Sequence, residues 1–233
     1  MNTINHVFEP SRLLLTWLQP IAEGVIRNRR VVAELIRENS AVTLHYLKNT
    51  PDYEMALKEG FDGFPAFDIK QIDHSMGVEE AFMRRLPPKK REDYFVFLAQ
   101  HHLPSDFGGS NFALLGLTGA RLPSDSFELC PDLTSAKAPI DVLIEVAGFR
   151  YHGLKADVTP QVGDPVTFAP DTENAHDADA VGIFLNGKKI GHINRALCSG
   201  MKRLMSTGSL TSNVIRVNGK PERPLIHILA SFK

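Results

Sequence analysis

The stretch from Glu173 to Arg195, ENAHDADAVGIFLNGKKIGHINR, contains the side chains of this sequence that are best suited to chemistry. Acidic residues and His176 come first, then two apolar segments separated by Asn186-Gly187, and then basic residues. Carboxylates and imidazoles can bind a metal ion or act as an acid–base pair, whereas lysine and arginine bind phosphate groups. The pattern therefore leaves three alternatives: a metal site, a catalytic pair, or a surface for a negatively charged ligand.

Metal binding and catalysis are the weaker alternatives. The possible hard ligands are Asp171, Glu173, His176, Asp177 and Asp179. This segment lacks the central glycine and the final glutamate of an EF-hand loop, and the sequence contains neither a GxSxG motif nor an HExxH zinc pair. Cys130 and Cys198 have no base near them in the sequence. We therefore expect a protein that is not an enzyme and needs no cofactor or metal, with a metal at segment 171–179 left open.

The distribution of charge favours an anionic ligand at the C-terminal end of the chain. The whole sequence of 233 residues has 26 basic and 27 acidic residues, so its net charge of −1 indicates no polyanionic partner. Residues 184–233, however, contain nine lysines and arginines and a single acid, Glu222. A solvated surface is the simplest explanation of such sorting. The alternative is a cationic face that contacts phosphates.

The fold class predicted from the residue pattern is α+β. Residues 1–129 begin with three strand-like segments, continue with short helices and are expected to form a mixed α/β domain. Residues 130–140, which include CPDLTSAKAP, show no apolar periodicity and are predicted to be a linker. Residues 141–233 contain six short strand-like segments and one helix that Asn194 caps, and Asn186-Gly187 is a strong hairpin signal. This half is expected to form a small curved sheet or barrel.

The C-terminal half resembles the HIRAN domain, a small β-rich module found fused to DNA-repair helicases and also alone in bacterial proteins. The similarity is carried by VAGFRYHG, by ENAHDADAVGIFLNGKKIGHINR and by the helix that follows. The positions that match the family pattern are Asn174, Asp177, Ala180, Val181, Gly191, His192 and Arg195. The resemblance covers residues 141–233.

This resemblance implies a six-stranded OB-like β-barrel that binds single-stranded DNA, notably at a free 3′ end. It implies that Arg150 and Tyr151 stack on or clamp a base, and that Asp177 accepts a hydrogen bond from the terminal 3′-hydroxyl. His192 and Arg195 would contact phosphate. The complete set of expected nucleic-acid-binding residues is Arg150, Tyr151, Asn174, His176, Asp177, Lys188, His192, Arg195 and Lys202.

Some residues depart from the family pattern, and some have simpler explanations. His176 stands where the family often has tyrosine, and Asp179 where it often has asparagine. The segment GKPERP replaces an aromatic residue expected before the last strand. These changes affect 3′-end specificity more than general nucleic-acid binding. Asn174 and Asp177 could also serve only to satisfy backbone groups of a turn, as such residues commonly do.

The N-terminal half resembles, more weakly, the amino-terminal subdomain of HipA-type toxin kinases. Phe82, Leu86-Pro87 and Gly119-Ala120 carry this similarity, which covers about residues 10–130. No phosphate-binding loop or kinase motif is present, so phosphotransfer is not expected. The resemblance implies a second class of function, an antitoxin-type regulator that binds a separate HipA-type kinase.

The sequence also predicts a cellular setting. The two cysteines are far apart, and no disulfide framework is indicated. The first twenty residues lack the basic region and the cleavage site of a signal peptide, and no segment is long enough to span a membrane. We therefore expect a soluble cytoplasmic protein whose partners are single-stranded DNA or DNA ends, and a protein such as a HipA-type kinase, but not a membrane.

Overall fold

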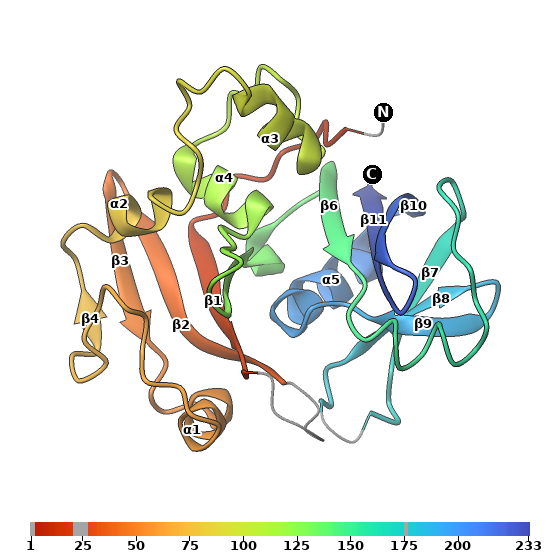
Figure 1. The fold of residues 1–233 in the computed structure, drawn as a ribbon, viewed down its shortest axis with the longest axis horizontal. Coiled ribbons are helices and arrows are strands. Elements are labelled where there is room, and N and C mark those ends of the chain that lie inside the picture. The colour runs from red at the N-terminus through yellow and green to blue at the C-terminus, as the bar shows by residue number, and fades with distance from the viewer. Residues whose placement is uncertain (1–2, 21–27, 175–176) are drawn as a thin grey trace. The chain divides into compact units, whose positions relative to one another are not determined.

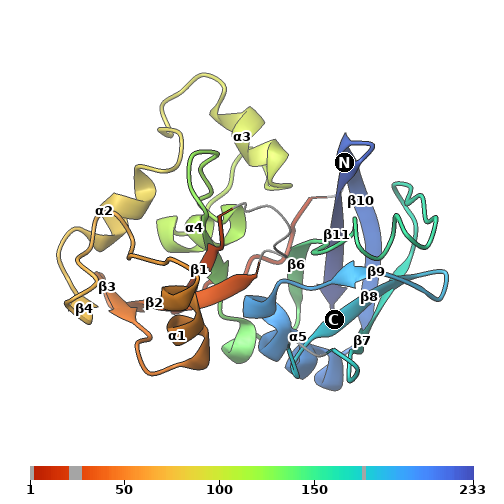
Figure 2. The ribbon, with the colours of Figure 1, turned by 60° about the horizontal axis from the view of Figure 1, so that its bottom comes forward.

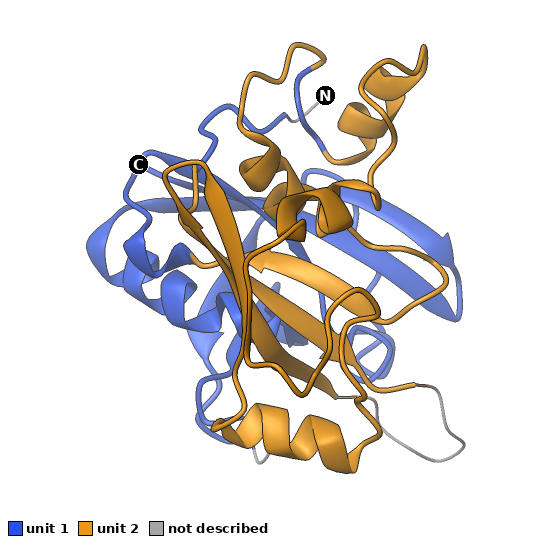
Figure 3. Ribbon diagram, turned by 90° about the vertical axis from the view of Figure 1, so that its left-hand side faces the viewer, with its two compact units in different colours: residues 1–8, 102–104, 133–233 blue, residues 9–101, 105–132 orange. Residues whose placement is uncertain are grey.

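The computed structural model describes residues 3–20, 28–174 and 177–233. Contacts within the chain divide it into two compact units, which Figure 3 shows in different colours. Unit 1 consists of residues 1–8, 102–104 and 133–233, and unit 2 of residues 9–101 and 105–132. Helices and strands occur in both units, so the predicted mixed α+β class is confirmed.

Unit 2 is built on a five-stranded antiparallel sheet with the strand order β4-β3-β2-β1-β5 (Figure 1). Its strands are β1 (Arg12–Leu18), β2 (Arg29–Glu38), β3 (Ala41–Tyr46), β4 (Asp73–His74) and β5 (Phe127–Pro131). Its helices are α1 (Pro51–Lys58), α2 (Val78–Met83), α3 (Tyr94–Gln100) and α4 (Asn111–Thr118). Alternating apolar residues of the strands supply the buried side chains of the sheet.

The predicted linker at residues 130–140 is structured along part of its length. Cys130 and Pro131 form the end of β5, and Leu133–Ser135 form a short 3₁₀ helix, η1. Asp132 between them is buried and accepts a hydrogen bond from Arg12 at 2.7 Å. Whether residues 1–129 and 141–233 fold independently stays a prediction.

The described residues of unit 1 form two three-stranded antiparallel sheets, one α-helix and the 3₁₀ helix η1. The first sheet has the order β10-β11-β6 and the second β7-β8-β9. The elements are β6 (Ile140–Glu145), β7 (Val166–Pro170), β8 (Val181–Leu185), β9 (Lys188–His192), α5 (Arg195–Thr207), β10 (Leu210–Lys220) and β11 (Arg223–Phe232). β10 and β11 form the longest hairpin of the chain (Figures 1 and 2). The strands and the helix lie where the sequence predicts them, except that β6 ends at Glu145, whereas the sequence predicts that this strand continues to Tyr151.

Two isolated bridges connect the edges of the two sheets. Ala147, just after β6, pairs with His192 at the end of β9 through two backbone hydrogen bonds of 2.9 Å. On the other side, Pro165 pairs with Asn213 of β10. The buried hydroxyl of Ser212 also donates to the carbonyl oxygen of Val166 at 2.7 Å. The two sheets of unit 1 are thus joined at both of their edges.

The helix α5 packs against η1 at very short range. Its N-cap is Asn194, whose side-chain oxygen accepts a hydrogen bond from the Ala196 N–H at 3.2 Å, as the sequence predicts. A Cβ atom at Gly200 would lie 2.3 Å from the Cβ of Leu133. Only glycine therefore allows the helix to approach η1 this closely, and this contact holds α5 in its place within unit 1.

Residues 3–8 belong to unit 1 and lie along β6. The backbone N–H groups of Asn5 and His6 donate to the buried carboxylate of Asp141 at 2.8 and 3.0 Å. Burial alone would raise the pKa of Asp141, but hydrogen bonds from Ser231 and from these two N–H groups outweigh it and lower the pKa. The N-terminal segment is therefore held on the sheet by a charge-assisted contact.

No helix in the described part of the chain combines the length and the apolar character that crossing a bilayer requires.

Candidate nucleic-acid interface

The hairpin of β8 and β9 positions the central residue of the site, His192. Asn186 and Gly187 both have positive φ angles, 51° and 76°, as a tight two-residue hairpin turn requires. A Cβ atom at Gly191 would lie 2.5 Å from the carbonyl oxygen of Ala147. Glycine at this position therefore lets β9 pair with Ala147, and the pairing fixes where the next side chain, His192, projects.

His192 connects two segments that are far apart in the sequence. Its Nε2 lies 2.7 Å from the Oδ2 atom of Asp171, and the Asn174 amide nitrogen lies 3.4 Å from the same Nε2. On the other side, its ring packs edge-on against the ring of His152, with 4.9 Å between the centroids. Only 18% of the His192 side chain is exposed. It thus links the turn after β6 to the acidic segment after β7.

Asp171 is held in its ionised form by hydrogen bonds from two side chains. The Lys189 ammonium lies 2.7 Å from Oδ2, and this hydrogen bond, with the one from His192, lowers the pKa of Asp171 to about 2. Nearby, burial and the positive charges of His192 and Lys189 lower the pKa of His152. The carboxylate therefore remains ionised at neutral pH and is matched by adjacent positive charge.

The loop between β7 and β8 is organised by its own side chains. Asn174 Oδ1 accepts a hydrogen bond from the Asp177 N–H at 3.0 Å, and Asp177 Oδ1 accepts one from the Asp179 N–H at 3.0 Å. These are the turn contacts that sequence reasoning offered as the simpler explanation. His176, which the sequence predicts as a binding residue, lies outside the residues that the structure describes.

The acidic loop pairs with the cations of α5. Arg195 Nε lies 3.4 Å from Asp177 Oδ2, and Lys202 Nζ lies 2.7 Å from Asp179 Oδ1. The hydrogen bond from Lys202 lowers the pKa of Asp179. Asp177 keeps 17% of its side chain exposed. Two of the cations that were predicted to face phosphate therefore already have a carboxylate beside them.

Arg150 and Tyr151 lie in a turn after β6, not at the end of a strand as the sequence pattern indicates. The Tyr151 N–H donates to the Gly148 carbonyl oxygen at 2.9 Å, which turns the chain away from the sheet. The guanidinium carbon of Arg150 lies 4.7 Å from the centroid of the Tyr151 ring, and Arg150 Nη2 hydrogen-bonds the Tyr151 hydroxyl. The Tyr151 residue is 40% exposed. The pair therefore presents an aromatic ring and a cation together at the surface.

Most of the predicted residues belong to one connected group. Asn174, Asp177, His192 and Arg195 are linked directly or through a shared neighbour, and Lys202 joins them through Asp179. Lys188 donates to the Ala156 carbonyl oxygen at 3.1 Å, so it contacts the segment that follows Tyr151. Which of these residues contact a ligand stays a prediction.

Sequence reasoning gave no nucleic-acid-binding role to three residues that the structure places in this group: His152, Lys189 and Asp171, the last of which it considered only as a possible metal ligand. The available signals were weak. His152 directly follows the aromatic Tyr151, and Asp171 follows the proline that ends β7. Within the described residues, no group of three or more His, Cys, Asp or Glu side chains is arranged to hold a metal ion.

The fold and the site define a mixed α+β protein whose β-rich unit carries a polar surface of paired charges beside an exposed aromatic–arginine pair. Comparison with known families assigns this unit more closely, because residues 141–232 match the model of the HIRAN domain family. This match confirms the HIRAN resemblance predicted from the sequence.

Two solved structures are similar to the same part of the chain. One is the HIRAN domain of human HLTF, with 20% identity over 40% of this chain and 74% of that chain, and a TM-score of 0.32. The other is a protein from Lactobacillus plantarum, with 18% identity over 40% of this chain and 99% of that one, and a TM-score of 0.31. No curated protein matches the chain. The resemblance of the N-terminal half to HipA-type kinases receives no support and stays a prediction.

Proposed function

We propose that residues 141–232 bind nucleic acid, that the ligand is single-stranded DNA or a DNA 3′ end, and that the protein acts by binding and not by catalysis. The match to the HIRAN family supports this proposal. The observation that carries it is the position of His192, which contacts the turn of Arg150 and Tyr151 through His152 and the loop of Asn174 directly. An aromatic ring, a cation and an acidic loop are thereby connected in one site.

These groups can bind the end of a single DNA strand. An exposed tyrosine ring offers a stacking platform for a base, a contact worth about 1–3 kcal/mol per base. Arg150, stacked on the ring, supplies positive charge beside it. A single base on Tyr151 thus brings its phosphate near a guanidinium group.

Asp177 is proposed to accept a hydrogen bond from a terminal 3′-hydroxyl. A carboxylate has about four acceptor positions, and the contacts with Asp179 N–H and Arg195 leave some of them for a ligand. A carboxylate near DNA also repels phosphate. Because Arg195 lies beside Asp177, the pair offsets this repulsion and favours a hydroxyl group at the carboxylate over a phosphate.

We further propose that the six strands of unit 1 form an OB-like barrel. The bridges Ala147–His192 and Pro165–Asn213 support this, because they join the two sheets at both edges. Binding without catalysis agrees with the state of Cys198, whose burial raises the pKa of its thiol to about 11 and keeps it in the unreactive protonated form.

Fluorescence anisotropy with labelled single strands tests the proposal. One strand carries a free 3′-hydroxyl and the other a 3′-phosphate, and both are titrated with the whole protein at several salt concentrations. We expect tighter binding to the free end, and loss of this preference in Asp177→Asn. Asp179→Asn is the matched control, since it removes a neighbouring charge of the same loop and should keep the preference.

The outcomes separate the parts of the proposal. Equal binding to both strands would leave nucleic-acid binding in place and refute end recognition by Asp177. Absence of binding even at low salt, where phosphate contacts are strongest, would refute the function as a whole.

A second function, regulation of a separate HipA-type kinase, is favoured by one observation in unit 2. Helix α3 exposes two adjacent apolar residues, Phe95 at 58% and Val96 at 41%. Exposed aromatic residues are common at protein interfaces. Copurification of such a kinase with the wild-type protein, and its loss in a Phe95→Ala variant, would support this alternative.

A further inference from the structure

The cations close to the Asp177 site are largely neutralised by the protein itself. Lys189 pairs with Asp171, and the contacts of Arg195 and Lys202 with loop carboxylates pair two more. A phosphate at any of these cations competes with a carboxylate at 2.7–3.4 Å. Strong contacts with a longer strand therefore require positive charge elsewhere on unit 1.

The hairpin of β10 and β11 carries such charge. Lys220 of β10 lies directly opposite Arg223 of β11. Side chains of directly opposite residues in an antiparallel pair share a face, so these two cations project from the same face of the hairpin. Lys220 and Arg223 are exposed, and within the described part of the chain no ion pair reaches either of them.

The pairing of Lys220 with Arg223 is unfavourable for the hairpin alone. Residues directly opposite each other in antiparallel strands have Cβ atoms about 5 Å apart, and like charges in such positions are destabilising. The tip is nevertheless tightly built, because Gly219 has a φ of 88° and a Cβ there would lie 2.6 Å from the Arg223 carbonyl oxygen. Glu222 lies between these cations in the turn, but no ion pair joins it to either of them within the described residues, so the closely packed tip keeps a net positive charge for an anionic ligand.

The tip projects at the same end of its sheet as the turn of Arg150 and Tyr151. The β11–β6 ladder runs from Phe232 to His227, and Val146 N–H then donates to the Ile226 carbonyl oxygen at 2.9 Å. Beyond this point β6 leads into the turn, whereas the β11–β10 ladder continues to Arg223. At about 3.3 Å per residue, the hairpin extends roughly 13 Å past the β6 ladder.

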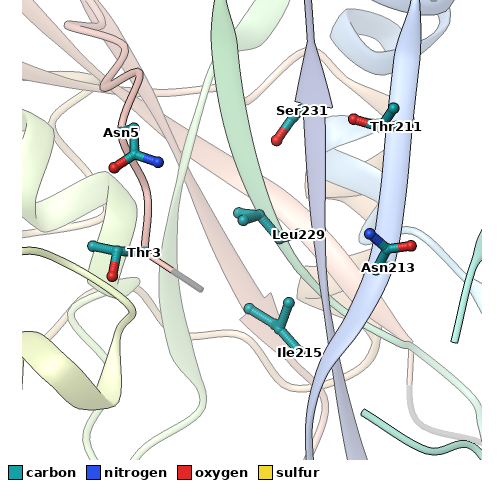
Figure 4. A pocket seen from close by; sticks show the side chains of 7 residues that line it. All are labelled: Thr3, Asn5, Thr211, Asn213, Ile215, Leu229 and Ser231. Carbon is teal, nitrogen blue, oxygen red and sulfur yellow. The ribbon is translucent and has the colours of Figure 1, made fainter. Parts of the chain in front are cut away.

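Residues of β10 and β11 also line a pocket of about 360 Å³. Figure 4 shows the side chains around it. Its polar lining consists of hydroxyl and amide side chains, those of Thr3, Asn5, Thr211, Asn213 and Ser231. Ile215 and Leu229 supply its apolar part. Arginine, lysine, serine, threonine and asparagine are the side chains that commonly bind phosphate and sugar oxygens of DNA.

We propose that this face of β10 and β11 is a second contact surface for the same nucleic acid, here called the hairpin track. The inference rests on the proposed function. The DNA strand whose end lies at Tyr151 and Asp177 places its next phosphates on Lys220 and Arg223. Its more distant sugars and phosphates then reach the hydroxyl and amide groups of the pocket.

The test compares wild type with Lys220→Ala/Arg223→Ala, using a short strand of about four nucleotides and a long one of about sixteen. Two lost contacts with single-stranded DNA lower the slope of log K against log salt by about 1.4. This corresponds to roughly 25-fold weaker binding of the long strand at 0.1 M salt. The short strand should bind almost as tightly as it does to wild type.

Two controls accompany this variant. Lys89→Ala/Lys90→Ala removes the same charge from exposed lysines of unit 2 and should leave both affinities unchanged. The melting temperature of Lys220→Ala/Arg223→Ala should be unchanged or higher, because the variant removes a pair of like charges.

Three results test the hairpin track. Wild-type affinity of the hairpin variant for the long strand, or an equal loss of affinity in the control variant, would each overturn it. Loss of long-strand binding in the hairpin variant alone supports it, even where wild type fails to distinguish free from blocked 3′ ends. In that case only end recognition at Asp177 fails.

Discussion

Replacement of Gly200 by alanine has two opposite effects on stability: it raises the helix propensity of α5, and it creates a steric clash with Leu133. Alanine is favoured over glycine in the interior of a helix by about 1 kcal/mol, so the sequence of α5 alone predicts that Gly200→Ala is stabilising. The structure predicts the opposite. The new Cβ would lie 2.3 Å from the Cβ of Leu133 and 2.7 Å from its carbonyl carbon, so both side-chain and backbone atoms would have to move.

The expected magnitude follows from these two effects. Overpacking of a well-packed contact costs about 1–3 kcal/mol, and a clash that includes backbone belongs at the upper end. After the gain in helix propensity, the free energy of unfolding should fall by about 2 kcal/mol. For a chain of this size, this lowers the melting temperature by about 4–8 °C.

The variant should also weaken DNA binding, because α5 carries Arg195 and Lys202, which pair with Asp177 and Asp179. Thermal unfolding by circular dichroism and anisotropy with single-stranded DNA measure the two effects. Ser199→Ala, an exposed neighbour on the same helix, is the control and should be neutral or slightly stabilising. A melting temperature of Gly200→Ala equal to or above that of wild type would refute the packing argument.

Two further predictions concern the site. Tyr151→Ala should weaken single-strand binding by about 1–3 kcal/mol through lost stacking, whereas Tyr151→Phe should bind nearly as wild type; equal affinities of the two variants in anisotropy would exclude stacking on this ring. The pKa of Asp171 is lowered to about 2 in the folded protein, so the stability that its ion pairs contribute is present above about pH 4 and is lost as the pH falls toward 2. Asp171→Asn should therefore be less stable than wild type at pH 7, and the difference in urea unfolding should shrink between pH 4 and 2. A constant difference would contradict this role of the carboxylate.

The local structure of this protein follows largely from its sequence. Asn186-Gly187 predicts the tight turn between β8 and β9, because these residues tolerate positive φ angles. Asn194 predicts the start of α5, because its side chain can cap free N–H groups. The residues of the HIRAN match were also recognisable in the sequence, since they form a motif with fixed spacing.

Only the tertiary structure decided how the charges of the site are paired. Residues 140–183 contain eight acids and only two basic residues, whereas residues 184–233 are mainly basic. The two segments could have formed separate acidic and basic faces. Instead they form ion pairs: Asp171 with Lys189, Asp177 with Arg195, and Asp179 with Lys202. These partners are 18 to 23 residues apart, and strand register and helix position bring them together. Periodicity along the chain reports only which face of an element is apolar, so it contains no information on such pairs.

The sequence also did not predict where two segments of backbone approach each other closely. From the sequence alone, Gly200 and Gly191 are expected to destabilise a helix and a strand. In the structure each is required, because another segment lies within 3 Å of the position that a Cβ atom would occupy. The sequence thus determined the elements and the family motif of this protein, because both depend on residues that are near one another in the chain. The fold decided which charges are paired with one another, because that depends on distances in space.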